Sequence, residues 1–230
     1  MLAKRIIPFS VSSPLCPAVL MLLMGMALTL LSPAAAAAPP TFYLQDGNGY
    51  WWDFSADGSV ADGSPTPLEN SDSFDGAMRL RVNGQLFADT ASQAQDGRMI
   101  ITGPQTVGGV LVTRRAYVPD TPGQGWACFL EYLENPAPAP VNVTVQVTGN
   151  LGSDGATTVT ASSSGDAVFT PADRWVASDD ANNGGGDPSL SFNYWGAGAP
   201  VTSTAVFLPA SQENYYVEYP VTIPGESTVI

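Results

Sequence analysis

The chain has 230 residues, with 8 basic and 21 acidic side chains, a net charge of −13 and no histidine. An acidic surface repels phosphate backbones and anionic lipids, which argues against nucleic-acid binding and against a membrane partner. The missing histidine excludes Ser-His-Asp and Cys-His catalysis, the usual catalytic zinc sites and imidazole pH sensing.

Residues 1–38 are predicted to be a secretory signal peptide with a helical apolar core. Lys4 and Arg5 form a short basic region, residues 18–31 are almost uninterrupted apolar sequence, and residues 34–38 are alanines that offer cleavage sites. This is the order of a signal peptide. An uncleaved membrane anchor is the alternative, but the run is short against the ~20 residues of a spanning helix. We expect cleavage close after Ala38 and a secreted protein, extracellular or at the cell surface, with a periplasmic location as the alternative.

The mature part, residues 39–230, is long enough for a single domain with a sizeable core. Without Lys4 and Arg5, the 8 basic residues become six arginines against 21 acids, a net charge of −15. Cys128 is the one cysteine left, so no disulfide can form within the mature chain. We expect Cys128 to be a buried, inert thiol, because no partner base exists.

Short apolar or alternating runs, punctuated by Gly, Pro, Asn and Asp, predict many short strands and no convincing helix after the leader. Residues 141–148 alternate valine with polar residues, which places one apolar face inward. Asn83-Gly84 is a plausible two-residue hairpin turn. The fold predicted from this pattern is an antiparallel β-sandwich. The strands are expected at 41–44, 50–54, 77–82, 99–102, 110–118, 127–134, 141–149, 157–162, 175–178, 191–194, 204–208, 215–219 and 228–230.

Two features bear on domain organisation. Residues 136–140, Pro-Ala-Pro-Ala-Pro, are stiff and could mark a boundary, but both flanks are β-like, so we interpret them as a connection between strands. Residues 221–230 end as a turn followed by a short strand. We therefore expect the chain to be a fragment, truncated at its C-terminus, of a longer protein.

The densest cluster of oxygen ligands is the segment 179–187, Asp-Asp-Ala-Asn-Asn-Gly-Gly-Gly-Asp. Hard cations such as calcium take carboxylate, amide and carbonyl oxygens on a flexible backbone. The alternative is a solvated turn, and the segment lacks the bidentate glutamate of an EF-hand. No other cofactor is predicted. The candidate calcium ligands are Asp179, Asp180, Asn182, Asn183 and Asp187.

Tyr50, Trp51 and Trp52 are the candidate ligand-binding residues. Three successive aromatics on a strand cannot all face one core, so at least one lies on the other face or at an edge. There a carbohydrate could stack, although aromatics on a sandwich also serve as core packing.

The acids give no catalytic pair. Glycoside hydrolysis would need two convergent carboxylates, but Glu131 and Glu134 are three apart on one predicted strand and point to opposite faces. We expect Arg174, with many acids around it, to hold the following acidic loop by a forked hydrogen bond.

Several spaced motifs, Asn-Leu-Gly-Ser-Asp at 150–154, Ser-Ser-Gly-Asp at 163–166 and Asp-Arg-Trp at 173–175 followed by Asp179-Asp180, give the mature chain a resemblance. It resembles a β-rich module near the N-terminus of large secreted bacterial proteins, which implies no catalytic residues and no named activity. The strand-rich layout is also similar to the large β-sandwiches attached to carbohydrate-active enzymes, at the level of the fold alone.

From the sequence we therefore expect a secreted structural or interaction module of an extracellular bacterial protein, without catalysis. Its expected partners are a polysaccharide or other domains of a longer chain. The first alternative is a carbohydrate-binding module that uses exposed aromatics. The second is a domain of a carboxylate-dependent glycoside hydrolase.

Overall fold

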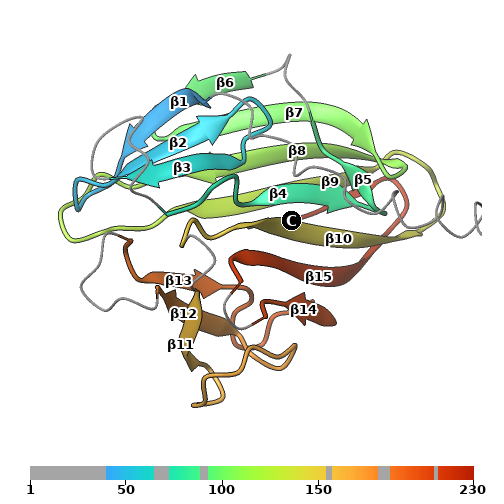
Figure 1. Cartoon of the computed structure of the whole chain (residues 1–230). Coiled ribbons are helices and arrows are strands. Elements are labelled where there is room, and N and C mark those ends of the chain that lie inside the picture. Colours follow the sequence, from blue (N-terminus) through green and yellow to red (C-terminus); the bar gives the residue numbers. More distant parts are fainter. Residues whose placement is uncertain (1–39, 65–72, 89–92, 154–156, 181–186, 210–211) are drawn as a thin grey trace, which may run out of the picture. The chain divides into compact units, whose positions relative to one another are not determined.

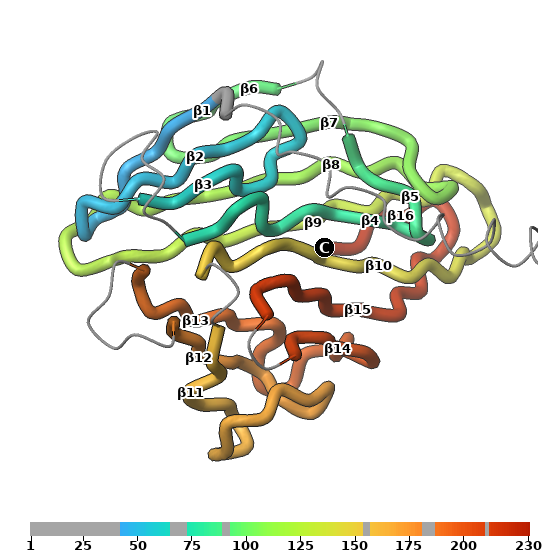
Figure 2. Tube along the Cα trace, in the orientation of Figure 1, coloured from blue at the N-terminus to red at the C-terminus, as the bar shows by residue number. Residues whose placement is uncertain are grey.

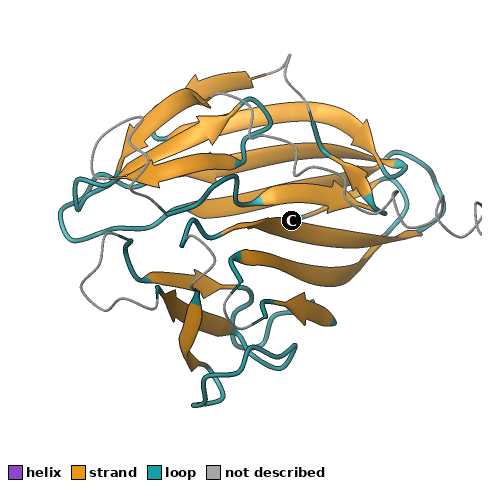
Figure 3. Ribbon diagram, in the orientation of Figure 1, coloured by secondary structure: helices purple, strands orange, loops and turns teal. Residues whose placement is uncertain are grey.

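A computed structural model describes residues 40–64, 73–88, 93–153, 157–180, 187–209 and 212–230. The predicted signal peptide lies outside these ranges. By its contacts, the chain divides into residues 1–36 and a compact unit of residues 37–230, to which every described residue belongs. The described residues form strands and loops without a helix, so none of them belongs to an apolar helix that could cross a membrane (Figure 3). The all-β prediction is confirmed.

Figures 1 and 2 follow the chain through its strands, which pair antiparallel throughout. The strands are β1 (Pro40–Gln45), β2 (Trp51–Ser55), β3 (Val60–Ser64), β4 (Arg79–Val82), β5 (Gln85–Leu86), β6 (Gln93–Asp96), β7 (Met99–Val107), β8 (Val110–Tyr117), β9 (Cys128–Asn135), β10 (Val141–Asn150), β11 (Thr158–Ser162), β12 (Trp175–Asp179), β13 (Leu190–Asn193), β14 (Ala205–Phe207), β15 (Asn214–Ile223) and β16 (Ser227–Val229).

The strands divide among four small sheets, each named here after one of its inner strands. The β2 sheet has the order β1-β2-β3, and the β12 sheet has the order β11-β12-β13. The β10 sheet has the order β14-β15-β10-β4-β5, and the β8 sheet has the order β16-β9-β8-β7-β6. The predicted all-β fold of antiparallel sheets is therefore confirmed. Its arrangement as a single β-sandwich is not, because the strands form four sheets.

Two clusters of buried side chains form the core. One joins the β8 and β10 sheets, with Val112 and Leu133 from the first and Leu80, Val82 and Val145 from the second, all at most 5% exposed. These residues alternate along their strands with outward-facing ones, as expected for sheets that bury one face. The prediction for residues 141–148 is confirmed, because Val143 and Val145 are buried.

The second cluster lies where the β2 sheet, the β8 sheet and β15 meet, around Phe54, Ile100 and Tyr215. It continues into the β12 sheet through aromatic contacts. Phe74 stacks on Trp52 at 5.6 Å between ring centroids and meets Phe192 of β13 edge-on at 5.8 Å. Aromatic pairs of this geometry stabilise packing beyond their buried area. Through Phe74 they tie the β2 sheet to the β12 sheet.

Each of the thirteen strands predicted from the sequence coincides with a strand of the structure, and the Asn83-Gly84 hairpin joins β4 to β5. Apart from β5, which is the second arm of this hairpin, two strands were missed. Asp62-Gly63 has the composition of a turn but lies inside β3, and β6 is a polar edge strand, Gln-Ala-Gln-Asp, without apolar alternation. Neighbouring strands supply the backbone partners that these sequences do not signal by themselves.

The proline-rich segment after β9 connects neighbouring parts of the fold. Asn135 is buried, and its amide donates to the carbonyls of Ala139 (2.8 Å) and Pro224 (3.1 Å) and accepts from the backbone N–H of Ala137 (3.1 Å). These hydrogen bonds hold the segment against the turn that precedes β16.

Candidate binding surfaces

The three aromatics Tyr50, Trp51 and Trp52 do not form one platform. The hydroxyl of Tyr50 donates to the carbonyl of Gly63 at 2.6 Å and lies 2.8 Å from the hydroxyl of Ser73. Trp52 packs against the core, and Trp51, on the opposite face of the strand, is half-buried. All three side chains are half-buried, and ligand binding by them stays a prediction.

Asp46 organises the turn between β1 and β2. Its carboxylate is buried and accepts from the backbone N–H groups of Asn48 and Tyr50, at 2.9 and 3.0 Å, and from Nε1 of Trp52 at 3.1 Å. The turn is bonded to the loop after β8, since the N–H of Gly47 donates to the carbonyl of Gln124 at 2.9 Å. Two loops far apart in sequence are thus fixed together.

An exposed aromatic pair lies beside these loops. Tyr117, at the end of β8, and Trp126 are 36% and 43% exposed, with ring centroids 5.8 Å apart and a 50° tilt between the rings. Large exposed aromatics on fixed loops are typical of binding surfaces rather than of ordinary surface.

The pair continues into the outer face of the β8 sheet. Along β9, Glu131 opposes the buried Arg114 and therefore points inward. Leu130 opposes Arg115 and points outward, as does Tyr132 two residues further on. Outward positions usually carry polar residues. Here Ile101 and Leu130 lie on the two strands that flank Arg115, each directly opposite it. Both are only half-buried, and neither belongs to a core cluster. We call this surface the β8 outer face, made up of Met99, Ile101, Leu111, Thr113, Arg115, Tyr117, Cys128, Leu130, Tyr132 and Glu134.

The interior of the same sheet holds a charged pair instead. Arg114, 1% exposed, donates from Nη2 to Oε1 of Glu131 at 2.7 Å, and from Nε to Oε1 and Oε2 at 2.9 and 3.2 Å. Glu131 and Glu134 do point to opposite faces, as predicted. Glu131 is the inward-facing one of the two and is paired with Arg114, whereas Glu134 lies on the outer face. The reach of Glu131 is therefore limited by this pair. The carboxylate of Glu131 is occupied by the guanidinium of Arg114, so Glu131 does not have the free carboxylate that glycoside hydrolysis requires.

A second pair of carboxyls lies on the β2 sheet, where Asp53 opposes Asp62. Burial, together with the nearby charges of Asp53 and Asp75, raises the pKa of Asp62 to about 6. A hydrogen bond from the backbone of Gly63 lowers this pKa but does not offset the rise. A raised pKa is common at catalytic acids. Asp53, however, is 0% exposed, so a substrate cannot reach it, and the pair is a structural feature.

The predicted calcium segment is only partly described, because Asn182 and Asn183 lie outside the described residues. Asp179 accepts from the backbone N–H of Asp180 and from the hydroxyl of Ser189, both at 2.9 Å. In the described ranges, no three acidic or cysteine side chains are grouped to hold a metal ion. Calcium binding by Asp179, Asp180 and Asp187 stays a prediction.

The loop before β12 is held by Asp173. Burial alone would raise the pKa of Asp173, but hydrogen bonds from Thr170 and Ser164 hold it well below its usual range. Arg174 is exposed, and between described residues the one ion pair is that of Arg114 with Glu131. Among the described residues, the fork predicted for Arg174 is not formed, so that prediction is wrong, and the arginine fork of the structure is that of Arg114 with Glu131.

Cys128 lies on the β8 outer face and is half-buried rather than fully buried. Burial raises the pKa of its thiol. A thiol of raised pKa holds less of the nucleophilic thiolate at neutral pH, which agrees with the inert role expected from the sequence.

No protein-family model matches the chain, and no curated protein or solved structure matches it either. The resemblance to a module of secreted bacterial proteins therefore stays a prediction, and the functional argument rests on the surfaces themselves.

Proposed function

We propose that the chain is a secreted, non-catalytic interaction module of an extracellular bacterial protein, and that its β8 outer face docks against another domain of a longer chain. The observation that carries this proposal is the apolar and aromatic character of that face, from Ile101 and Leu130 to the exposed Tyr117–Trp126 pair. Contiguous apolar surface of this kind mostly marks an interface.

The composition of the face favours a protein partner. Arg115 lies over the ring of Tyr132, with its Cζ 4.5 Å from the ring centroid. Arginine, tyrosine and tryptophan are the residues most enriched among energetically dominant interface positions. The face has few acids although the mature chain has a net charge of −15, and low charge at the centre is typical of an interface core.

An apolar dye tests whether the face is open in the isolated exported chain. We expect anilinonaphthalene sulfonate to fluoresce with the wild-type protein and to lose most of this signal with Leu130→Gln or Ile101→Gln. Leu86→Gln is the matched control, because Leu86 is 40% exposed but lies on β5 of another sheet. A folded wild-type protein that leaves the dye dark would contradict the proposal, as would equal losses in all three variants.

Carbohydrate binding is the second candidate function. It is favoured by a different surface, the outer face of the β10 sheet, which combines stacked aromatic rings with arginine, amide and hydroxyl groups.

A further inference from the structure

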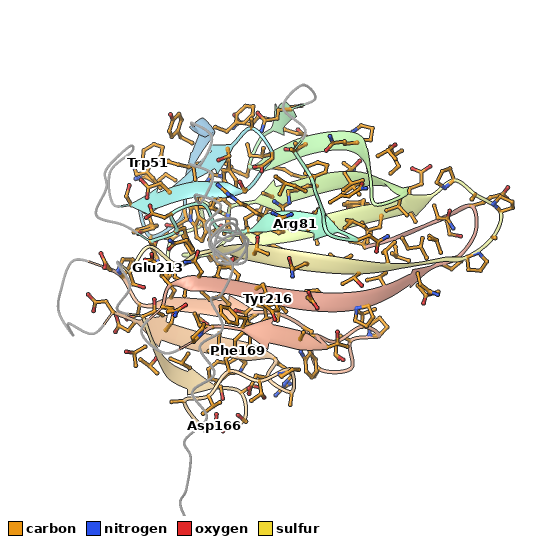
Figure 4. All side chains as sticks on the ribbon, turned by 45° about the vertical axis from the view of Figure 1, so that its right-hand side comes forward. Trp51, Arg81, Asp166, Phe169, Glu213 and Tyr216 are labelled. Carbon is orange, nitrogen blue, oxygen red and sulfur yellow. The ribbon has the colours of Figure 1, made fainter. Side chains whose placement is uncertain are left out.

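The outer face of the β10 sheet has two rows of side chains that cross its strands. In the first row, Phe207 opposes Tyr216, Tyr216 opposes Thr148, and Thr148 opposes Arg79. The second row lies two residues further along each strand and therefore on the same face. It consists of Ala205, Glu218, Gln146, Arg81 and Leu86. Figure 4 labels Tyr216 on β15 and Arg81 on β4, one from each row.

The first row begins with an aromatic pair. The rings of Phe207 and Tyr216 are parallel within 1°, with centroids 5.4 Å apart, and Phe207 is 42% exposed. Within the described part of the chain, neither ring stacks on a third. Phe207 therefore offers an exposed ring that is backed by the half-buried Tyr216. Such a ring suits the apolar C–H face of a sugar, while the sugar hydroxyls at its rim need hydrogen-bonding partners.

The remaining residues of the two rows supply hydrogen-bonding partners for the sugar hydroxyls. The amide of Gln146 donates to Glu218 at 2.7 Å, which fixes both side chains on the face, and Thr148 lies between Tyr216 and Arg79. Arg81 donates from Nη1 to the carbonyl of Gly84 at 3.1 Å. A guanidinium has five N–H donors in a planar fork that matches a carboxylate.

Charge also singles out this face. The mature chain has six arginines against 21 acids, but these rows hold two arginines and one acid, Glu218, which is hydrogen-bonded to Gln146. Exposed charges further apart than about 8 Å are largely screened at physiological ionic strength. The acidic remainder of the protein therefore does not prevent a carboxylate from binding locally at Arg81, although it disfavours polyanions elsewhere.

We infer that this face binds a polysaccharide that contains carboxylated sugars. The uronate carboxylate binds at Arg81, and a neighbouring sugar packs on Phe207 and Tyr216. The first row crosses three strand spacings, about 14 Å, so the face contacts several successive sugars of a chain. This role goes beyond the docking proposed for the β8 outer face and uses none of its residues.

Native affinity electrophoresis of the exported chain tests the inference, with polygalacturonate or alginate cast into the gel and dextran as the neutral polysaccharide. We expect retardation by the carboxylated polymers and little by dextran. Tyr216→Ala and Arg81→Gln should each weaken binding about tenfold, while Tyr216→Phe keeps it. The matched controls are Tyr43→Ala, at an exposed tyrosine of β1, and Arg174→Gln, at an exposed arginine just before β12. Both should bind as wild type.

The two proposals fail separately. Leu130→Gln should lose the dye signal and keep polysaccharide binding, and Arg81→Gln should do the reverse. The inference is overturned if no carboxylated polymer retards the protein, if dextran retards it equally, or if folded Tyr216→Ala and Arg81→Gln bind no more weakly than their controls. Circular dichroism of each variant establishes that it is folded.

Discussion

The guanidinium of Arg114 and the carboxylate of Glu131 face each other across neighbouring strands inside the β8 sheet, joined by three contacts of 2.7 to 3.2 Å. Arg114 is 1% exposed, and its Cζ lies 5.5 Å from the ring centroid of Phe129. A buried pair of this kind adds little net stability over an apolar pair, but removing one partner leaves an uncompensated charge.

We therefore expect Glu131→Gln and Arg114→Met each to lower the free energy of unfolding by about 3–5 kcal/mol. Arg114→Lys should lose most of the same amount, because an ammonium cannot form the two parallel hydrogen bonds of the fork. Urea denaturation at neutral pH measures each loss. Arg174→Lys, at an exposed arginine, is the control and should change little. An Arg114→Lys variant as stable as wild type would show that charge alone suffices.

Asp62 makes the stability of the fold depend on pH, and this dependence can be measured separately from the contribution of the Arg114–Glu131 pair. Its pKa is raised to about 6, chiefly by burial and then by Asp53 and Asp75, whereas an unfolded aspartate titrates near 3.9. Between about pH 4 and 6 the folded chain holds a proton that the unfolded chain has released. The free energy of unfolding therefore falls as the pH rises through this window, and it stays lower above it.

Asp62→Asn removes this titration. We expect it to raise the melting temperature at pH 7 by the equivalent of about 1 kcal/mol, after allowance for solvent screening, and to have little effect at pH 3.5. Melting curves across this range measure the difference. Asp120→Asn, at an exposed aspartate, is the control. If Asp62→Asn melts below wild type at pH 7, the carboxylate stabilises the fold and the assignment is wrong.

The sequence predicted the strands well because alternation is a local property. Residues 141–148 show their buried face in the spacing of valine alone. The surfaces could not be predicted in the same way. Arg114 and Arg115 are adjacent and identical in type, and adjacent strand residues point to opposite faces. Only the pairing with β9 decides that Arg114 meets Glu131 inside and that Arg115 lies over Tyr132 outside.

The same limit applies to the candidate sites. Tyr50, just before β2, donates a hydrogen bond to Gly63 of β3, and Trp52 of β2 donates one to Asp46, after β1. Both bonds depend on the position of β2 between β1 and β3. The row from Phe207 to Arg79 combines residues from four strands, and its two end residues are 128 positions apart in the sequence. No local signal marks such a row. The strand register creates it, and sequence patterns leave the register open.

Gly58 offers a last test, because it lies against the buried Arg114. Its φ of +71° is in the left-handed region, and a Cβ there would lie 2.9 Å from Oγ1 of Thr102 and 3.0 Å from Cδ of Arg114. Gly84 has a similar φ of +77° but nothing within 4 Å of its Cβ position. Both alanine variants bear the backbone cost of about 1–2 kcal/mol, but only Gly58→Ala also overpacks the interior, which adds about 1–3 kcal/mol. Urea denaturation of the two variants isolates that second contribution, because the shared backbone cost cancels in the comparison. Equal losses for Gly58→Ala and Gly84→Ala would mean that the turn moves away from Arg114 without penalty, and that the ion pair is less tightly enclosed than the structure describes.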